Sequence, residues 1–426
     1  MTIYFPALSH CPRKFSKMVI LSHPTGNNFV REAAVALCES AHLHEFHTCI
    51  AACGNNVFQK LGCLPGLSEI NRRACPDSLF QYLQIHPWRE ICRLASGRLG
   101  FNFLTMHESG FFSIDAVYKN FDKSVAKYVR KSKPSAVYCY EDGALETFRA
   151  ANKNGAKCIY DLPIGYWRAG RKIMQEEVDR RPEWGPTMLG LQDSMEKLQR
   201  KEEELRLSDH IIVASSFTRK TLEDCPFPLA PISIIPYGCG SISKSAVKKS
   251  KEGPLRALFV GGLSQRKGIA DLFEAVDSLQ GRVTLTLIGR KTVSDCLSLN
   301  NALKVHNWIP SLPHEEILRE MRNHDVLVFP SLFEGFGLVI TEALSQGLPV
   351  ITTSHTCGPD MITNGLDGFI VPIRSSDAIA VKLEQICNDR LLLSEMSQMA
   401  LKKANERAWS FYRSGISQIV NAVFSK

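Results

Sequence analysis

The sequence predicts an α/β protein with two doubly wound parallel-sheet domains that face each other across a cleft. Three observations support this prediction. The 426 residues are too many for one hydrophobic core. Short apolar, β-branched runs alternate with segments of helical spacing, which indicates parallel sheets covered on both faces. A stretch rich in Ser, Lys and Gly, residues 241–254, separates two such series and is typical of a linker.

The second series, residues 255–405, alternates more regularly than the first. Strands are expected at residues 255–262, 283–289, 326–330, 349–353 and 368–372, with a short one at 304–307. Helices are expected after Gly268, at 315–321, around Glu342 and at 377–387. Residues 406–426 are predicted to form a final amphipathic helix.

The first series, residues 1–240, is less regular but similar. Strands are expected at residues 17–23, 135–142, 156–163 and 210–216. A glycine turn after the first strand leads into a helix at residues 29–40. A long helix rich in Glu and Lys is expected at residues 188–207, with a solvated outer face.

Composition excludes several classes of protein. With 44% hydrophobic and 22% charged residues, the chain has the make-up of a soluble globular protein. It lacks the ~20-residue apolar run that spans a bilayer. Basic residues follow the apolar start of the chain, which is not the order of a secretory signal. The 14 scattered cysteines suggest reduced thiols, so a cytoplasmic protein is expected. No nucleic-acid-binding motif accompanies the net charge of +8.

One local concentration of positive charge occurs at residues 116–133. Its basic residues lie opposite apolar ones at helical spacing: Lys119, Lys123, Lys127, Arg130, Lys131 and Lys133 against Val117, Phe121, Val125 and Tyr128. The favoured interpretation is a helix with a core face and a solvated basic face. The alternative is peripheral contact with anionic lipid headgroups or a lipid-linked acceptor.

The most informative segment is PSLFEGFGLVITEALSQGLPVI, residues 330–351. A buried strand ends, a glycine loop turns, and a helix begins after Gly337. This geometry directs backbone N–H groups and the positive end of a helix toward an anion such as a diphosphate. Glu334 in the loop and Glu342 early in the helix can accept hydrogen bonds from sugar hydroxyls.

The segment GGLSQRKG, residues 261–268, follows another strand. Arg266 and Lys267 are suited to phosphate. Two cations at the start of a helix are unfavourable with the helix dipole. Their presence there is therefore better explained by an anionic ligand than by a role at the surface of the helix end. They can stabilise a departing diphosphate. Because no Asp-x-Asp pair accompanies them, no metal is expected.

Residues 330–351 resemble the signature of the retaining glycosyltransferases of family 4, through Pro330, Ser331, the EGFGL turn, both glutamates and GLPV at 347–350. The resemblance covers about residues 255–372. It implies the GT-B architecture of two Rossmann-like domains, with the helix at 406–426 crossing back onto the first. The family's Arg usually follows the first glycine, where this chain has Gly262, so we expect Arg266 to replace it.

The same resemblance implies roles for individual residues. It makes Glu334, Arg266 and Lys267 catalytic, with Glu334 at the donor sugar. The implied donor site comprises Gly261, Gly262, Ile309, Gly335, Phe336, Gly337, Leu338, Val339 and Glu342, the last at the ribose. The acceptor side is expected at His23, Gly26, Asn27, Asn28, Glu141, Asp142 and Asp161 of the first domain.

The predicted function is transfer of a sugar from a nucleotide sugar to a hydroxyl of a glycan, glycolipid or small molecule. Retention of anomeric configuration is expected, with no cofactor. The partners would be the nucleotide sugar and a glycan or lipid-linked acceptor, not nucleic acid. A nucleotide-sugar epimerase or hydrolase on the same architecture is the alternative, as is a non-catalytic sugar-nucleotide-binding protein.

Overall fold

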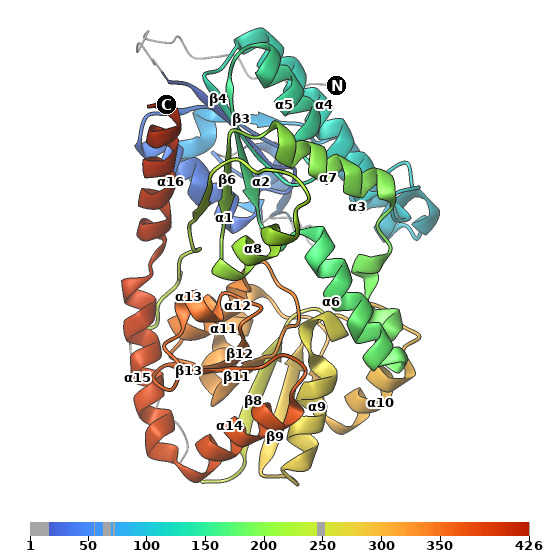
Figure 1. The fold of residues 1–426 in the computed structure, drawn as a ribbon, viewed down its shortest axis with the longest axis vertical. Helices are drawn as coiled ribbons and strands as arrows, with labels where there is room; N and C mark the ends of the chain where they lie inside the picture. Colours follow the sequence, from blue (N-terminus) through green and yellow to red (C-terminus); the bar gives the residue numbers. More distant parts are fainter. Residues whose placement is uncertain (1–16, 55, 63–69, 71–72, 245–251, 426) are drawn as a thin grey trace.

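Two parallel sheets, one above the other, form the two domains of the protein (Figure 1). The computed structural model describes residues 17–54, 56–62, 70, 73–244 and 252–425. The first sheet has seven strands in the order β3-β2-β1-β4-β5-β6-β7, and the second has six in the order β10-β9-β8-β11-β12-β13. The predicted fold class is confirmed. Residues 1–16 and 245–251, at the start of the chain and within the expected linker, lie outside the described residues.

The first sheet is buried under helices because its central strands are apolar throughout, as in β1 and β4. Its strands are β1 (Val19–Ser22), β2 (Leu43–Thr48), β3 (Leu83–Ile85), β4 (Ala136–Tyr140), β5 (Lys157–Leu162), β6 (His210–Val213) and β7 (Ile232–Ile234). Its helices are α1 (Asn28–Glu39), α2 (Val57–Gly62), α3 (Trp88–Arg98), α4 (Ile114–Ser132), α5 (Leu145–Lys153), α6 (Trp167–Arg180), α7 (Met195–Leu207) and α8 (Ser216–Thr221).

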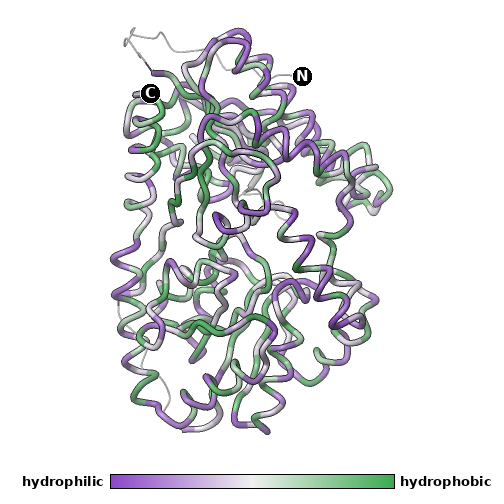
Figure 2. The backbone as a smooth tube through the Cα atoms, in the orientation of Figure 1, coloured by the Kyte–Doolittle hydropathy of each residue, from purple (hydrophilic) through white to green (hydrophobic). Residues whose placement is uncertain are grey.

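The second sheet follows the predicted alternation of strand and helix. Its strands are β8 (Leu255–Val260), β9 (Val283–Ile288), β10 (Asn307–Ile309), β11 (Val326–Phe329), β12 (Val350–Thr353) and β13 (Gly368–Val371). The helices of this half are α9 (Ile269–Ser278), α10 (Leu297–Val305), α11 (His314–Asn323), α12 (Leu338–Ser345), α13 (Gly358–Met361), α14 (Ser376–Asn388), α15 (Arg390–Glu406) and α16 (Trp409–Phe424). In Figure 2 the hydrophobic colour concentrates on the strands of both sheets.

Two predicted boundaries were wrong. The charged helix begins at Met195 rather than at residue 188, because the Ser194 hydroxyl accepts a hydrogen bond from the Lys197 N–H and caps it there. The short strand expected at 304–307 begins only at Asn307, since Lys304 and Val305 complete α10. The strands β2, β3 and β7 and several helices, among them α10, α13 and α15, were not anticipated.

The last helix lies against the first domain. α16 packs on α1, and the Arg413 guanidinium binds the Glu32 carboxylate at 2.7 Å. Tyr412, Ile416 and Val420 form its buried face. In Figure 1, α15 and α16 run along one side of the molecule from the lower domain to the upper one. No helix among the described residues has the length and apolarity needed to cross a bilayer.

Candidate functional site

Each sheet has a point where the direction of strand order reverses, and ligands of such sheets bind there, beyond the carboxyl ends of the strands. In the first sheet this point lies between β1 and β4, and in the second between β8 and β11. The loops that follow β8 and β11 are residues 261–268 and 330–337. Both of the segments singled out from the sequence therefore lie at one switch point.

Backbone and side-chain contacts join these two loops. The Arg266 carbonyl accepts hydrogen bonds from the Leu332 N–H at 2.9 Å and the Ser331 hydroxyl at 3.2 Å. The Lys267 ammonium contacts the Glu334 carboxylate directly. Arg266 lies 3.5 Å from the same carboxylate and donates to the Phe333 carbonyl at 2.6 Å. The structure thus brings together the three residues expected to be catalytic.

The electrostatics of the cation pair follow from its burial. Desolvation lowers the pKa of Arg266 to about 10, so its guanidinium stays protonated at neutral pH. Burial, and secondarily the Arg266 charge, lower the pKa of Lys267. The contact with Glu334 acts in the opposite direction and favours the ammonium form. A second anion at this point would be held by two desolvated positive groups.

A cavity of about 240 Å³ opens beside the cation pair. From the second domain it is lined by Gly262, Ser264, Arg266, Lys267 and Thr292. The opposite wall comes from the first half of the chain: Met174, Thr187, Met188, Leu189 and Gly190. Sequence reasoning missed this wall, because residues 188–207 were expected to form one continuous helix. The run RRPEWGPT just before it, with two prolines and a glycine, was the available signal that the chain turns there.

The glycine loop itself packs on the first domain. A Cβ on Gly335 would lie 1.9 Å from the Pro163 carbonyl oxygen, so only glycine permits this approach. The hydroxyls of Ser215 and Thr218 donate to the Gly335 carbonyl at 2.5 and 2.8 Å. At Gly337, a φ of +88° turns the chain into α12, which has no side-chain cap. The N-terminal N–H groups of this helix remain suited to an anion.

Phe333, next to Glu334, anchors the same loop. Its ring fills the space that side chains at Gly165 and Gly170 would occupy, with either Cβ coming within 2.7 Å of it. It also meets the Phe217 ring edge-on at 5.7 Å. Asp360 accepts hydrogen bonds from the Ser216 N–H and hydroxyl at 2.9 and 3.0 Å. Contacts with the loop between β5 and α6, with α6 and with α8 therefore fix the position of Glu334.

The second glutamate lies apart from the cation pair. The Glu342 side chain, in α12, is 31% exposed and lies 3.8 Å from the His314 ring nitrogen. Burial raises its pKa, and His314 opposes this shift. Glu342 is not part of the lining of the 240 Å³ cavity. The two glutamates thus face different environments.

The other expected donor residues lie in different environments: some are hydrogen-bonded within the sheet, one borders open space, and others are buried or half-buried. The Gly261 N–H donates to the Ile288 carbonyl, and the Ile309 carbonyl accepts from the Gly289 N–H, so both belong to the sheet. Gly262 has open space around its Cβ position, with only the Thr292 methyl at 3.8 Å. Phe336 is buried against Tyr237 at 4.9 Å, while Leu338 and Val339 are half-buried in the first turn of α12.

At the switch point of the first sheet, His23 organises the glycine turn. Its Nδ1 accepts hydrogen bonds from the N–H groups of Thr25 and Gly26 at 3.1 and 3.2 Å. Burial lowers the pKa of His23 to about 3, so the ring is neutral. The Asn27 carboxamide accepts from the Thr25 hydroxyl at 3.0 Å, and Asn28 is exposed at the start of α1. His23 therefore shapes the loop, and the asparagines remain on its outer side.

Glu141 and Asp142, beyond β4, are held by a lysine of α7. The Lys201 ammonium lies 3.1 Å from Glu141 and 3.5 Å from Asp142. Burial raises the pKa of Glu141 to about 6, and Lys201 opposes this shift. The Asp142 N–H donates to the buried carboxylate of Glu204 at 2.9 Å.

Asp161 does not face the cleft, contrary to expectation. It is 1% exposed and accepts a hydrogen bond from the Tyr138 hydroxyl at 2.7 Å. The hydroxyls of Tyr140, Tyr237 and Tyr412 are also buried, without a hydrogen-bond partner among the described residues. Burial raises the pKa of Asp161 to about 7. At the end of β5 this side chain lies in the core under α16. We therefore interpret Asp161 as a core residue whose carboxyl keeps its proton to a higher pH than an exposed aspartate does.

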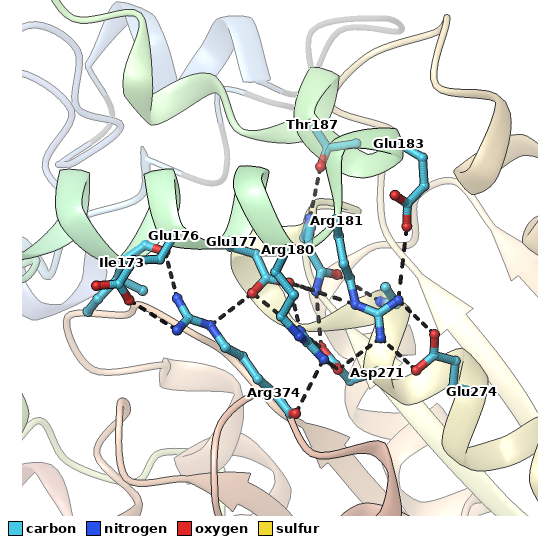
Figure 3. A network of polar contacts seen from close by, with 12 residues as sticks. Ile173, Glu176, Glu177, Arg180, Arg181, Glu183, Thr187, Asp271, Glu274 and Arg374 are labelled. Carbon is cyan, nitrogen blue, oxygen red and sulfur yellow. Dashed lines mark hydrogen bonds and ion pairs between the residues drawn. The ribbon is translucent and has the colours of Figure 1, made fainter.

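A network of buried charges joins α6 to the second domain (Figure 3). Arg180 binds both Glu177 and Asp271. Arg374, in the loop between β13 and α14, binds Glu177 at 2.9 Å. The Gln265 amide donates to Glu177 at 2.7 Å and to Asp271 at 3.1 Å. Because Gln265 immediately precedes Arg266, the network also positions the cation pair.

A further cluster of charged residues in the described part of the chain has the side chains of a possible metal site. His107, Glu108 and Asp193 present ligand atoms within 4.8 Å of one another. The Lys197 ammonium binds Asp193 at 3.0 Å and Asp115 at 3.0 Å in the same place. Lys197 thus pairs with Asp193 and Asp115, and Glu108 lies 3.4 Å from the His107 ring, so we interpret the cluster as an ion-pair network.

Comparison with known proteins shows which proteins the second half of the chain resembles. Residues 242–406 match the model of the family "Glycosyl transferases group 1". Over 225 residues the chain is 26% identical to a glycogen synthase of Mycobacterium tuberculosis, covering 50% of this chain and 54% of that protein. It is 30% identical over 159 residues to the capsular polysaccharide biosynthesis glycosyltransferase CapM of Staphylococcus aureus, covering 35% and 41%. The chain thus spans about half the length of these relatives.

Solved structures share the whole fold. A sucrose-phosphate synthase from Thermosynechococcus elongatus superposes with a TM-score of 0.67 at 16% identity, covering 96% of this chain and 99% of that one. Anabaena HepE in complex with UDP-glucose superposes with a TM-score of 0.60 at 14% identity, with the same coverage. Residues 242–406 of this chain are therefore similar to the glycosyl transferases group 1 family, and the chain has the GT-B fold.

Proposed function

We propose that this protein is a glycosyltransferase that moves a sugar from a nucleotide-sugar donor to an acceptor hydroxyl of a glycan, lipid-linked glycan or small molecule. The observation that carries the proposal is the meeting of Arg266, Lys267 and Glu334 at the switch point of the second sheet. The names of the relatives support the reaction class. The UDP-glucose bound by HepE supports a nucleoside diphosphate sugar as donor.

The donor site would use charge for the diphosphate and carboxylates for the hydroxyls. The diphosphate binds Arg266, Lys267 and the N–H groups at the start of α12. The Lys267 ammonium then breaks its contact with Glu334 and binds a phosphate oxygen instead. Glu334 is released to accept hydrogen bonds from the sugar, and Glu342 accepts from the ribose. The two cations stabilise the charge that develops on the leaving diphosphate, about 3 kcal/mol for one such group. This arrangement requires no metal ion.

The transfer would retain the anomeric configuration. The bond between the anomeric carbon and the diphosphate oxygen breaks, and the acceptor oxygen bonds to the same face of that carbon. Glu141 and Asp142 are engaged by Lys201, which makes either a poor general base. The acceptor proton therefore passes to the leaving phosphate oxygen.

We assign the acceptor to the first domain, residues 1–240, and the donor to residues 255–405, with 241–254 as the linker and 406–426 as the returning helix. The acceptor would approach along the loop at His23, Gly26, Asn27 and Asn28. The cavity wall at residues 187–190 supports this geometry, since it brings the first half of the chain against the donor cations.

A donor-turnover assay separates the candidate functions. The protein is incubated with a panel of nucleotide sugars, in EDTA, with and without glycan, glycolipid and simple alcohol acceptors. A transferase releases nucleoside diphosphate faster when acceptor is present and forms a new glycosidic bond. Acceptor-independent release indicates a hydrolase, and a changed sugar without release indicates an epimerase. Binding without any turnover indicates a binding protein.

A further inference from the structure

Exposed hydrophobic side chains are concentrated in one lobe of the first domain, residues 88–114. Of the eighteen large hydrophobic residues that are exposed in the described part of the chain, eight belong to these residues. They are Trp88, Ile91, Leu99, Phe101, Phe103, Met106, Phe111 and Ile114. Scattered exposed hydrophobics are ordinary, but a contiguous group of this kind marks an interaction surface.

Hydrogen bonds and a cation–π contact show that the lobe is continuous. The Phe112 N–H donates to the Leu104 carbonyl at 2.7 Å, which joins the 101–105 turn to the start of α4. The Arg89 guanidinium lies 4.6 Å from the Phe111 ring centre and donates to the Phe111 carbonyl at 2.8 Å, which joins α3 to the same point. In Figures 1 and 2 the lobe projects beside α3, at the right of the upper domain.

The charge of the lobe is positive. Residues 88–114 contain three arginines, Arg89, Arg93 and Arg98, and two acidic residues, Glu90 and Glu108. Glu90 is buried and neutralised by Arg73 and Arg93, and the Glu108 carboxylate lies 3.4 Å from the His107 ring. Arg98 lies on the exposed side, next to Leu99. α4 leaves the lobe at Ile114 and carries exposed Lys123 and Lys127 within ~20 Å, at 1.5 Å per helical residue.

We propose that residues 88–114 form a membrane-docking lobe that inserts its aromatic and aliphatic side chains into the interface of a bilayer containing anionic lipids. Protruding Trp, Phe and Leu side chains next to Arg and Lys are the chemistry that such an interface binds. Leu99 and Phe103 are 69% and 65% exposed, so these side chains protrude far enough from the lobe to enter the lipid interface.

The lobe is also tied to the cleft. The Ser194 N–H donates to the Glu108 carboxylate at 2.9 Å, and residues 188–190, a few positions earlier, line the cavity beside the cation pair. Docking would thus hold the cleft near the bilayer surface, which suits a lipid-linked acceptor. That consequence rests on the proposed function, whereas the docking itself does not.

Vesicle co-sedimentation of the full chain tests the docking. We expect binding to vesicles of equal parts phosphatidylglycerol and phosphatidylcholine, weaker binding to phosphatidylcholine alone, and at least tenfold weaker binding for the variant Leu99→Ser/Phe101→Ser/Phe103→Ser. The matched control, Leu297→Ser/Leu391→Ser/Phe411→Ser, replaces equally exposed residues elsewhere and should bind as the wild type does.

Two results would overturn the docking proposal. One is equal sedimentation of the lobe variant and the control. The other is no vesicle binding by the wild type, with a dimer in analytical ultracentrifugation that the lobe variant converts to monomer, which assigns the surface to a second copy. Circular dichroism verifies that each variant is folded. Because sedimentation needs no donor, the docking can fail or hold independently of the transferase activity.

Discussion

The hydroxyl of Ser215 donates a hydrogen bond of 2.5 Å to the carbonyl of Gly335, which joins the first domain to the loop that carries Glu334. Both groups are fully buried or nearly so. The glycine loop is therefore held from outside its own domain. A substitution in the first domain should therefore shift the loop that carries Glu334 without replacing any residue of that loop.

Ser215→Ala tests this relationship. Removing the hydroxyl leaves a buried carbonyl with only Thr218 as side-chain donor, and the free energy of unfolding should fall by about 1–2 kcal/mol. Turnover should fall more than donor affinity, because the position of Glu334 is affected. Denaturant titration and steady-state kinetics measure both. Ser278→Ala, at an exposed serine of α9, should change neither.

The two glutamates should differ in kinetic effect. Glu334→Gln should lower kcat by about a hundredfold or more, from the magnitude of one transition-state contact. Glu342→Gln should mainly raise the KM for the donor, because the ribose contact that we propose would be equally strong in the ground state and the transition state. The exposed Glu395→Gln on α15 serves as the control. Wild-type kinetics in both variants would remove the glutamates from the site.

Stability should depend on pH through Asp161. Its pKa is raised from 3.8 to about 7 in the folded protein, so the folded state holds a proton that the unfolded state has lost in this range. The resulting stability is complete below pH 3.8 and is lost as the pH rises through about 7. Asp161→Asn should reduce the slope of unfolding free energy against pH between these values.

The exposed Asp224→Asn is the matched control for this pH dependence and should keep the wild-type slope. Glu204, whose pKa burial raises to about 8, contributes a slope of the same sign, so part of the dependence should persist in Asp161→Asn. An unchanged slope in Asp161→Asn would show that the carboxyl is ionised in the folded protein.

The network around α6 offers a matched pair of substitutions. Glu177→Gln should cost about 3 kcal/mol of stability, because Arg180 and Arg374 lose a buried carboxylate. Glu176→Gln removes a half-exposed partner of Arg374 and should cost less than about 1 kcal/mol. Thermal unfolding distinguishes the two. Equal losses would mean that burial does not govern this network.

Strand periodicity and the motifs near Glu334 and Lys267 were sufficient to predict the second sheet, the strands β1, β4, β5 and β6 of the first, and the proximity of the cation pair to the glycine loop. These features depend on local pattern and on the rule that parallel strands end at one edge. The wall at residues 187–190 and the docking of Phe333 between Gly165 and Gly170 could not be predicted. They depend on contacts between segments far apart in the sequence, for which a single sequence carries no periodic signal.

The direction of Asp161 could not be predicted for a related reason. Residues near a strand end alternate between faces, and a shift of one position moves a carboxylate from the cleft to the core. The buried tyrosines around Asp161 come from β4, from the segment after β7 and from α16, so only the folded chain brings them together.

The most direct test of the account is calorimetric titration of nucleoside diphosphates in EDTA. UDP, GDP, ADP and TDP are titrated into the wild type, Lys267→Ala and, as a control, Lys402→Ala, an exposed lysine of α15. The account predicts that one of these nucleotides binds the wild type and Lys402→Ala without metal, and binds Lys267→Ala about a hundredfold more weakly, as expected for a lost desolvated charge. Equal affinity in all three proteins, or binding that appears only when magnesium is added, would contradict it.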